Sequence, residues 1–249
     1  MSSPKRSVVV KLLLNTLNAF AGGVLDSLLV FGVVFLLLDA LVPSQDLPWT
    51  PLRLTDPIGV ASRAKIDDAA KSSRACIQAL TTNGVRFSAA ISPALTGPCV
   101  IPTPVELDED LYPHGPVVDC PLAAAFALWS RQGVQEAAMR LLGQRVVAFD
   151  QAGAYECRGV RADSGTATLA SQPSAHARGD AIDIAGFKLE DGSTVTVAKD
   201  WADPGPRGQF LHAVRQSACA VFHVTLSPDY NQSHKDHLHL DMGRSRLCS

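Results

Sequence analysis

The residues best suited to chemistry lie in two short clusters, which together hold four of the seven histidines. The first cluster spans residues 174–184 and reads SAHARGDAIDI. The second spans residues 234–241 and reads HKDHLHLD. Imidazole nitrogens combined with one carboxylate oxygen suit Zn²⁺. The two clusters therefore predict one metal site assembled from distant parts of the chain.

Strands and a turn would have to position these side chains. Alternate residues of a strand share one face, so His237 and His239 would point together. Gly179 permits a tight turn that brings His176 back over Asp183. Three protein ligands leave a fourth position for water, which is the catalytic rather than the structural arrangement of zinc. Such a zinc lowers the pKa of its water towards 7, and a base must then take the proton.

The surrounding pattern predicts an α+β domain, a small antiparallel sheet with helices packed on it. The expected helices cover residues 67–82, 121–142 and 206–222, with a break at Gly133. The expected strands cover residues 85–90, 145–149, 181–189, 194–197 and 238–242. Residues 190–193 (EDGS) form a hairpin signal. Residues 91–116 are rich in Pro and Gly and are expected to be a long irregular loop.

The N-terminal segment is apolar and follows Lys5, Arg6 and Lys11. Its densest part, residues 27–38, is shorter than the roughly 20 residues that a membrane span needs. Extending the span backwards places Asp26 inside it, which is costly. Two interpretations remain open, an uncleaved signal anchor and a cleaved signal peptide with a poor cleavage site.

Of these two interpretations we expect the uncleaved signal anchor. The longer apolar stretch can supply the length of a span, whereas the cleavage site of a signal peptide is poor. Residues 1–42 are then a cytoplasmic N-terminus and one transmembrane helix. Residues 43–57 contain four prolines and are expected to be an extended linker. Residues 58–249 form the domain, which this orientation places outside the cytoplasm.

The six cysteines all follow residue 70, and no two of them form a C-x-x-C pair. An even number beyond a membrane segment indicates disulfides in an oxidising compartment, with free buried thiols as the alternative. Sequence alone does not choose among the possible pairings. We expect Cys76–Cys99, Cys120–Cys157 and Cys219–Cys248.

The charge balance argues against one class of partner. The chain has 22 basic and 24 acidic residues and a formal net charge of −2, and no basic stripe stands out. Nucleic acid is therefore not expected as the main partner.

The order S-x-H-x-x-G-x-A-x-D followed by H-x-x-H-x-H resembles the LAS metallopeptidases, which include D-Ala-D-Ala peptidases, murein endopeptidases and the Hedgehog signalling domain. More closely, residues 70–248 resemble the extensin-like C-terminal domain of bacterial envelope proteins. The supporting stretches are YECR at 155–158, the block 176–187, DW at 200–201, AC at 218–219 with Phe222, and PDYN at 228–231. The resemblance implies an LAS-like zinc core that hydrolyses amides in peptidoglycan peptides, as an endopeptidase or carboxypeptidase. It also implies that the anchor lies in the bacterial inner membrane and the domain in the periplasm.

Carried over position by position, the resemblance implies that zinc is held by His176, Asp183 and His239. His234 would be the general base, as in the murein endopeptidases. His237 would orient the water, stabilise the oxyanion, or act as a second-layer hydrogen-bond partner of a ligand. The dipeptidases have a glutamate where this chain has Asp236, so Asp236 is a second-choice base with a shorter reach.

Other residues have supporting or open roles. Asp241 is expected to support a histidine, and Ser174 to cap or brace the His176 loop. Arg158 could bind a substrate carboxylate or form a salt bridge. Arg178 is expected at the surface. His114, His212 and His223 are expected to be structural.

Two functions of different classes remain. The first is the zinc-dependent hydrolase of peptidoglycan peptides in the cell envelope. The alternative is a non-catalytic zinc domain that binds cell-wall glycan or a protein partner.

Overall fold

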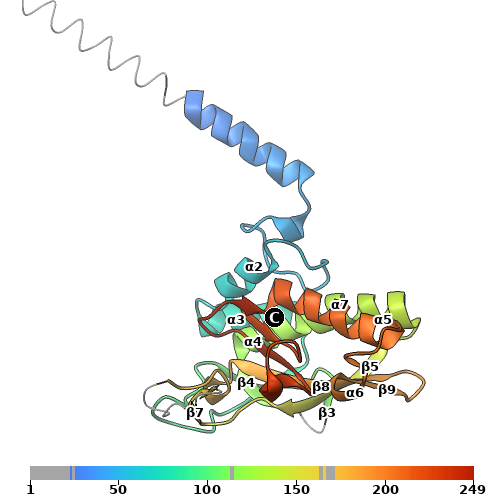
Figure 1. The fold of residues 1–249 in the computed structure, drawn as a ribbon. Coiled ribbons are helices and arrows are strands. Elements are labelled where there is room, and N and C mark those ends of the chain that lie inside the picture. The colour runs from blue at the N-terminus through green and yellow to red at the C-terminus, as the bar shows by residue number, and fades with distance from the viewer. Residues whose placement is uncertain (1–22, 24–25, 113–114, 163–164, 167–171) are drawn as a thin grey trace, which may run out of the picture.

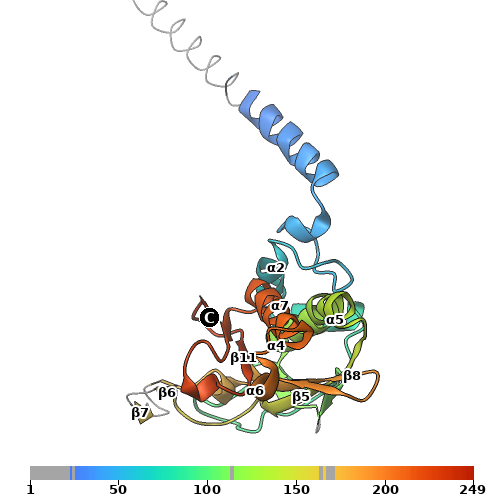
Figure 2. The same cartoon turned by 45° about the vertical axis from the view of Figure 1, so that its right-hand side comes forward.

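The computed structural model describes residue 23 and residues 26–112, 115–162, 165–166 and 172–249. A mostly antiparallel sheet lies on one side of the domain, and helices cover one of its faces (Figures 1 and 2). Its strands follow the order β12-β10-β11-β8-β5-β3, and β9 also pairs with β8. Two pairs, β10 with β12 and β3 with β5, are parallel. The predicted α+β class with a small antiparallel sheet and packed helices is confirmed.

These elements have the following bounds. The strands of the main sheet are β3 (Leu111–Tyr112), β5 (Val146–Gly153), β8 (Ala181–Leu189), β9 (Thr194–Thr196), β10 (Val224–Leu226), β11 (Leu238–Asp241) and β12 (Leu247–Cys248). The helices of the domain are α2 (Ser62–Ala69), α3 (Ser73–Thr82), α4 (Cys120–Leu128), α5 (Gln135–Leu142), α6 (Val197–Asp200) and α7 (Pro206–Val221). The hairpin predicted around residues 190–193 is confirmed by the pairing of β8 with β9.

Aromatic side chains fill the space between the helices and the sheet. Trp129 is fully buried, and its indole N–H donates to the Val214 carbonyl at 2.9 Å. Its ring contacts Phe126, Phe187 and Phe222 in edge-on geometry, with centroids 5.8, 6.2 and 6.0 Å away. These contacts join the helical layer to β8 and stabilise the sheet face opposite the candidate site.

Two helix predictions are corrected. The predicted helix over residues 67–82 is two helices, α2 and α3, because the Ser72 side chain accepts a hydrogen bond from Ala75 N and caps a new N-terminus. Gly133 does not break the helical stretch but lies in a π-helical turn, Trp129–Val134, between α4 and α5. A Cβ at Gly133 would lie 2.5 Å from Ser217 Oγ, so glycine permits the close approach of α7.

The segment 91–116, predicted to be an irregular loop, contains β3 and also β2 (Pro104–Leu107). A separate three-stranded sheet places β2 between β1 (Phe87–Ala89) and β4 (Val117–Asp119). Val105 and Leu107 of β2 are fully buried, so pairing and burial override the Pro- and Gly-rich composition. A two-stranded ribbon of β6 (Arg161–Ala162) and β7 (Gly165–Thr166) completes the strands.

Residues 43–57 pack against the domain and do not form an extended linker. Leu54 is 1% exposed and belongs to the hydrophobic core. The Lys65 ammonium donates to Ser44 O at 2.6 Å, and the Gln132 side chain donates to Leu54 O at 2.8 Å. The domain therefore includes residues that we had placed before its start at residue 58.

Residues 26–41 form a helix that projects away from the domain (Figure 1). The predicted membrane segment also includes residues 1–22, which lie outside the described residues. Among the helices that are described, none combines the length and the apolar composition needed to cross a membrane.

All six cysteines are paired, as Cys76–Cys120, Cys99–Cys157 and Cys219–Cys248. The prediction of disulfides and of the third pair is confirmed, and the first two predicted pairs are wrong. Helices α3 and α4 pack together and bring Cys76 to Cys120, although 44 residues separate them in the chain. The disulfide pairs follow the packing of the helices and strands, whereas the prediction paired cysteines that are consecutive in the sequence.

Candidate metal centre

Strands β8 and β11 place Asp183 and His239 side by side. The two residues are direct partners in the antiparallel ladder. Their strand neighbours Ile182 and Leu240 belong to the hydrophobic core. Since successive side chains of a strand alternate between its faces, Asp183 and His239 lie on the face away from the helices.

A tight turn adds His176 to this pair. Residues His176–Arg178 form one 3₁₀ turn, which ends at Gly179 in the left-handed conformation (φ 66°). A Cβ at Gly179 would lie 2.9 Å from the Ile101 side chain and 3.0 Å from Asp119 N. Both the backbone conformation and the lack of space require glycine here. The turn that the sequence predicts at Gly179 is confirmed.

The three predicted ligands converge on one point. His239 Nδ1 lies 2.9 Å from Asp183 Oδ1 and 3.2 Å from His176 Nε2, and His176 Nε2 lies 3.4 Å from Asp183 Oδ2. One ligand atom from each residue lies within 4.8 Å of the other two. His176 is buried, and the other two side chains are largely shielded from solvent. This cluster is a candidate metal site, which we call the metal centre, and its donor set suits zinc.

The opposite ring nitrogens fix the orientation of both imidazoles. His176 Nδ1 lies 2.8 Å from Ala154 O, which is a pure acceptor, so Nδ1 carries the proton. His239 Nε2 lies 3.2 Å from Asp241 Oδ2, and an ionised carboxylate likewise requires the proton on Nε2. In the neutral form of each ring, His176 Nε2 and His239 Nδ1 would therefore direct lone pairs at the centre, as metal-binding histidines do.

The centre requires a positive charge. Burial alone would lower the pKa of His239, yet its hydrogen bonds with Asp183 and Asp241 raise that pKa to about 9. Burial disfavours the ionised form of Asp183, but hydrogen bonds from His176 and His239 hold its pKa far below the ordinary value. Two lone pairs and a carboxylate in contact repel one another unless a proton or a cation lies between them. A divalent cation fits this demand.

His234 and His237 border the centre without joining the three ligands. The His234 ring lies 5.8 Å from that of His239 and 5.3 Å from that of His237. Burial, followed by the charges of His239 and His237, lowers the pKa of His234 to about 4. His237 Nε2 lies 3.7 Å from Asp183 Oδ1. At neutral pH His234 is therefore neutral and able to accept a proton.

Two side chains hold these rings. Asn231 Oδ1 accepts from His234 Nδ1 at 2.7 Å, which leaves Nε2 of that ring with its lone pair. Asp236 Oδ1 accepts from His237 Nδ1 at 2.9 Å, so Asp236 contacts His237 and not the three ligands. We assigned no role to Asn231 from the sequence. Asn231 lies in the PDYN stretch that supports the family resemblance, but nothing in the sequence marked it as a partner of His234.

The remaining predicted residues lie at different distances from the centre. Ser174 is buried, and its Oγ accepts from Ala177 N at 3.2 Å within the His176 turn. Arg158 pairs with Glu156 at 2.6 Å, so the salt-bridge alternative is confirmed and a substrate contact stays a prediction. Arg178, expected at the surface, is partly buried and donates to Asp180 at 2.9 Å.

Two of the three histidines expected to be structural are described. The His212 ring packs against Trp201 at a centroid distance of 4.3 Å. His223 bonds Asp67 through Nε2 and Gly243 O through Nδ1. His114 lies outside the described residues.

Fold and site together define an α+β domain with a His–Asp–His cluster on the open face of its sheet. Residues 74–249 match the family described as "Extensin-like protein C-terminus". The chain therefore belongs to the extensin-like C-terminal family, as the sequence led us to expect. No curated protein and no solved structure matches the chain.

Proposed function

We propose that the chain is a zinc-dependent hydrolase that cleaves an amide bond in peptidoglycan peptides, with a centre of the LAS metallopeptidase kind. The observation that carries this proposal is the convergence of His176 Nε2 and His239 Nδ1 on the Asp183 carboxylate, with the opposite ring nitrogens hydrogen-bonded to Ala154 O and Asp241. Three protein ligands would leave the fourth position of a zinc ion to water, whereas structural zinc sites are closed by four protein ligands.

The residues divide the chemical work. His176, Asp183 and His239 would hold zinc, which supplies a Lewis acid that polarises a carbonyl and a water of lowered pKa. His234 takes a proton from the attacking water and returns it to the departing amine. Its neutral ring, with Nδ1 tied to Asn231, presents the lone pair that this step needs.

His237 has a separate part. Its ring lies between Asp236 and Asp183, and side-chain exposure of 17% leaves it accessible to a bound substrate. We assign it to the developing oxyanion, because an N–H donor near the reacting carbonyl stabilises charge that appears in the transition state.

The proposed location is the periplasmic side of the bacterial inner membrane. Three disulfides support an oxidising compartment. The apolar side chains of residues 28–38 are exposed along the projecting helix, which supports an anchoring role for the segment that contains it. Peptidoglycan peptides are the substrate within reach of such a protein.

The test combines metal content with cleavage. Full-length protein in an uncharged detergent is loaded with zinc and incubated with muropeptides, and new amines are measured. We expect one equivalent of zinc and cleavage in the wild type. His176→Ala should lose both, whereas His234→Ala should keep the metal and lose cleavage by about 10²–10⁴-fold. Zinc binding without cleavage of any muropeptide would leave the non-catalytic binding domain as the function.

A further inference from the structure

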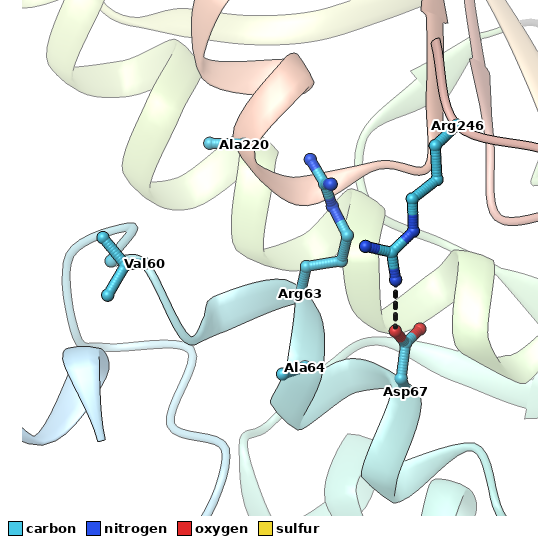
Figure 3. Close-up of a pocket in the computed structure, with 7 residues that line it drawn as sticks. Val60, Arg63, Ala64, Asp67, Ala220 and Arg246 are labelled. Atoms are coloured by element: carbon cyan, nitrogen blue, oxygen red, sulfur yellow. Dashed lines mark ion pairs between the residues drawn. The ribbon is translucent and has the colours of Figure 1, made fainter. Parts of the chain in front are cut away.

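A second polar site lies where α2, the end of α7 and the C-terminal segment meet. It is a cavity of about 360 Å³ lined by Gly59, Val60, Arg63, Ala64, Asp67, Ala220 and Arg246. Figure 3 shows the Arg63 and Arg246 side chains extending into this space, with Asp67 beside them. We call it the arginine pocket. It shares no lining residue with the metal centre.

Arg63 is held by one edge only. Its Nη2 donates to Cys219 O, whereas its buried Nε has no hydrogen-bond partner among the described residues. Burial, followed by the nearby charge of Arg246, lowers the pKa of Arg63. A buried guanidinium donor without an acceptor is unfavourable, so this group calls for an oxygen ligand.

The pocket has too little negative charge of its own. Asp67 is its one carboxylate, and that group is shared: Oδ1 bonds His223 at 2.9 Å, and Oδ2 lies 3.8 Å from Arg246 Nη2. Two arginines and one aspartate leave a net charge of +1 facing the cavity. Arg246 is 67% exposed on its side chain, so it can close on a ligand without disturbing the core.

The remaining lining is small and apolar. Ala64 and Ala220 carry only methyl groups, and Val60 is 89% exposed at the rim. This combination offers guanidinium forks for a group with several oxygens and apolar contact for an attached carbon chain. A phosphodiester has two anionic oxygens, as a carboxylate has, but its tetrahedral phosphorus also carries two carbon substituents, so one group can meet the guanidinium groups and the apolar lining together.

We propose that the arginine pocket binds the phosphate group of a phosphate ester, with Arg63 and Arg246 as its two ligands. The single negative charge of a phosphodiester matches the net charge of the lining, and its carbon substituents would contact Val60 and Ala64. Such a group can belong to a soluble ester or to a lipid headgroup, and the experiment separates these sources.

Calorimetry on the full chain in an uncharged detergent provides the test. The probes are inorganic phosphate, glycerophosphoglycerol, and micelles containing phosphatidylglycerol or phosphatidylcholine, with acetate at equal ionic strength as the carboxylate control. We expect saturable binding of glycerophosphoglycerol and none of acetate. Tighter binding of phosphatidylglycerol micelles than of glycerophosphoglycerol would assign the pocket to a lipid headgroup, and equal binding to a soluble ester.

Variants show whether binding occurs in this pocket. Arg246→Gln removes one exposed ligand and should weaken binding at least about tenfold, since a hydrogen bond to a charged group is lost. Arg63→Lys keeps the charge but loses the fork and should weaken binding as well. Arg244→Gln, an exposed neighbour outside the lining, is the matched control. Equal loss in the control, unchanged binding in Arg246→Gln, binding of acetate, or no binding of any phosphate probe would overturn the proposal.

Discussion

In each imidazole of the metal centre, one ring nitrogen makes a hydrogen bond to the surrounding protein and the other faces the candidate metal position. His176 Nδ1 donates a hydrogen bond to a backbone carbonyl, and no side-chain substitution removes that acceptor directly. His239 Nε2 donates a hydrogen bond to the Asp241 side chain, which a substitution can change. A substitution can therefore remove the hydrogen-bond acceptor of His239 but not that of His176.

Replacing Asp241 by Asn should weaken zinc binding by about 10–100-fold, because the amide is a poorer acceptor for His239 and makes its Nδ1 less basic. Competition with a fluorescent chelator measures the affinity. Asp236→Asn is the matched control, since Asp236 bonds His237 and not a ligand, and its zinc affinity should stay within about twofold of wild type. Equal affinities in both variants would show that Asp241 does not support the ligand.

Elements set the distances that these residues need. The β8–β11 register makes Asp183 and His239 partners, and a slip of β11 by one residue would turn His239 towards the helices while Asp183 stayed on the open face. The 3₁₀ turn at 176–178 needs Gly179, which has a left-handed backbone and no room for a Cβ. The position of His176 therefore depends on the glycine at residue 179.

Gly179→Ala should lower both zinc affinity and the free energy of unfolding. Gly192, at the β8–β9 turn, also has positive φ (84°) but faces open space, so Gly192→Ala is a matched control. The left-handed backbone alone costs an alanine about 1–2 kcal/mol. We expect that loss for Gly192→Ala with unchanged zinc affinity, and about 2–4 kcal/mol with weakened zinc binding for Gly179→Ala. Denaturant titration and metal competition measure the two effects, and equal effects at both glycines would contradict this account.

The packing of α3 on α4 predicts a cross-link that can be mapped chemically. Digestion without reduction should yield peptides that join Cys76 to Cys120 and Cys99 to Cys157. The double variant Cys76→Ser, Cys120→Ser leaves no unpaired thiol and should cost on the order of 3 kcal/mol of unfolding free energy. A peptide that joins Cys76 to Cys99 would contradict the packing of these two helices.

At the scale of the whole molecule, buried carboxylates make stability depend on pH. Burial raises the pKa of Asp119 to about 6, against the hydrogen bond from Thr103 N, and the Asp180 carboxylate adds to the increase. A folded pKa above the unfolded value of 3.8 favours the folded state while the group is neutral. That contribution is complete below about pH 4 and is lost as pH rises through about 6.

Asp119→Asn should therefore flatten the fall in unfolding free energy between pH 4.5 and 7 by on the order of 2 kcal/mol. Its amide oxygen can still accept from Thr103 N, so the fold should be kept. Guanidinium titrations at several pH values, with a chelator present, measure the effect. Glu136→Gln, at an exposed carboxylate, should follow the wild-type curve. A variant curve parallel to wild type would show that Asp119 does not titrate in this window.

Local patterns were sufficient for some parts of the molecule and not for others. The β8–β9 hairpin, helix α7 and the Gly179 turn follow from spacing and turn chemistry within a few residues, so the sequence predicted them. The convergence of His176, Asp183 and His239 followed from two motifs. The buried Leu54 and the partner of Cys76 depend on contacts between segments tens of residues apart, which no local pattern carries. The same is true of the Ala154 carbonyl, which has no side-chain signal at all. The new helix start at Ser72 rests on a local cap, from Ala75 N to Ser72 Oγ, that our prediction of one continuous helix overlooked.

Asp183 and His239 are 56 residues apart in sequence, and His176 is 63 residues from His239. The three side chains come together only after this long-range strand pairing has formed. A metal ion present early in refolding should therefore have little effect on the folding rate. A bound ion would instead slow the reverse reaction, because β8 and β11 can separate only after it leaves. A metal ion at this position would therefore slow the unfolding of the folded domain and would not nucleate its folding.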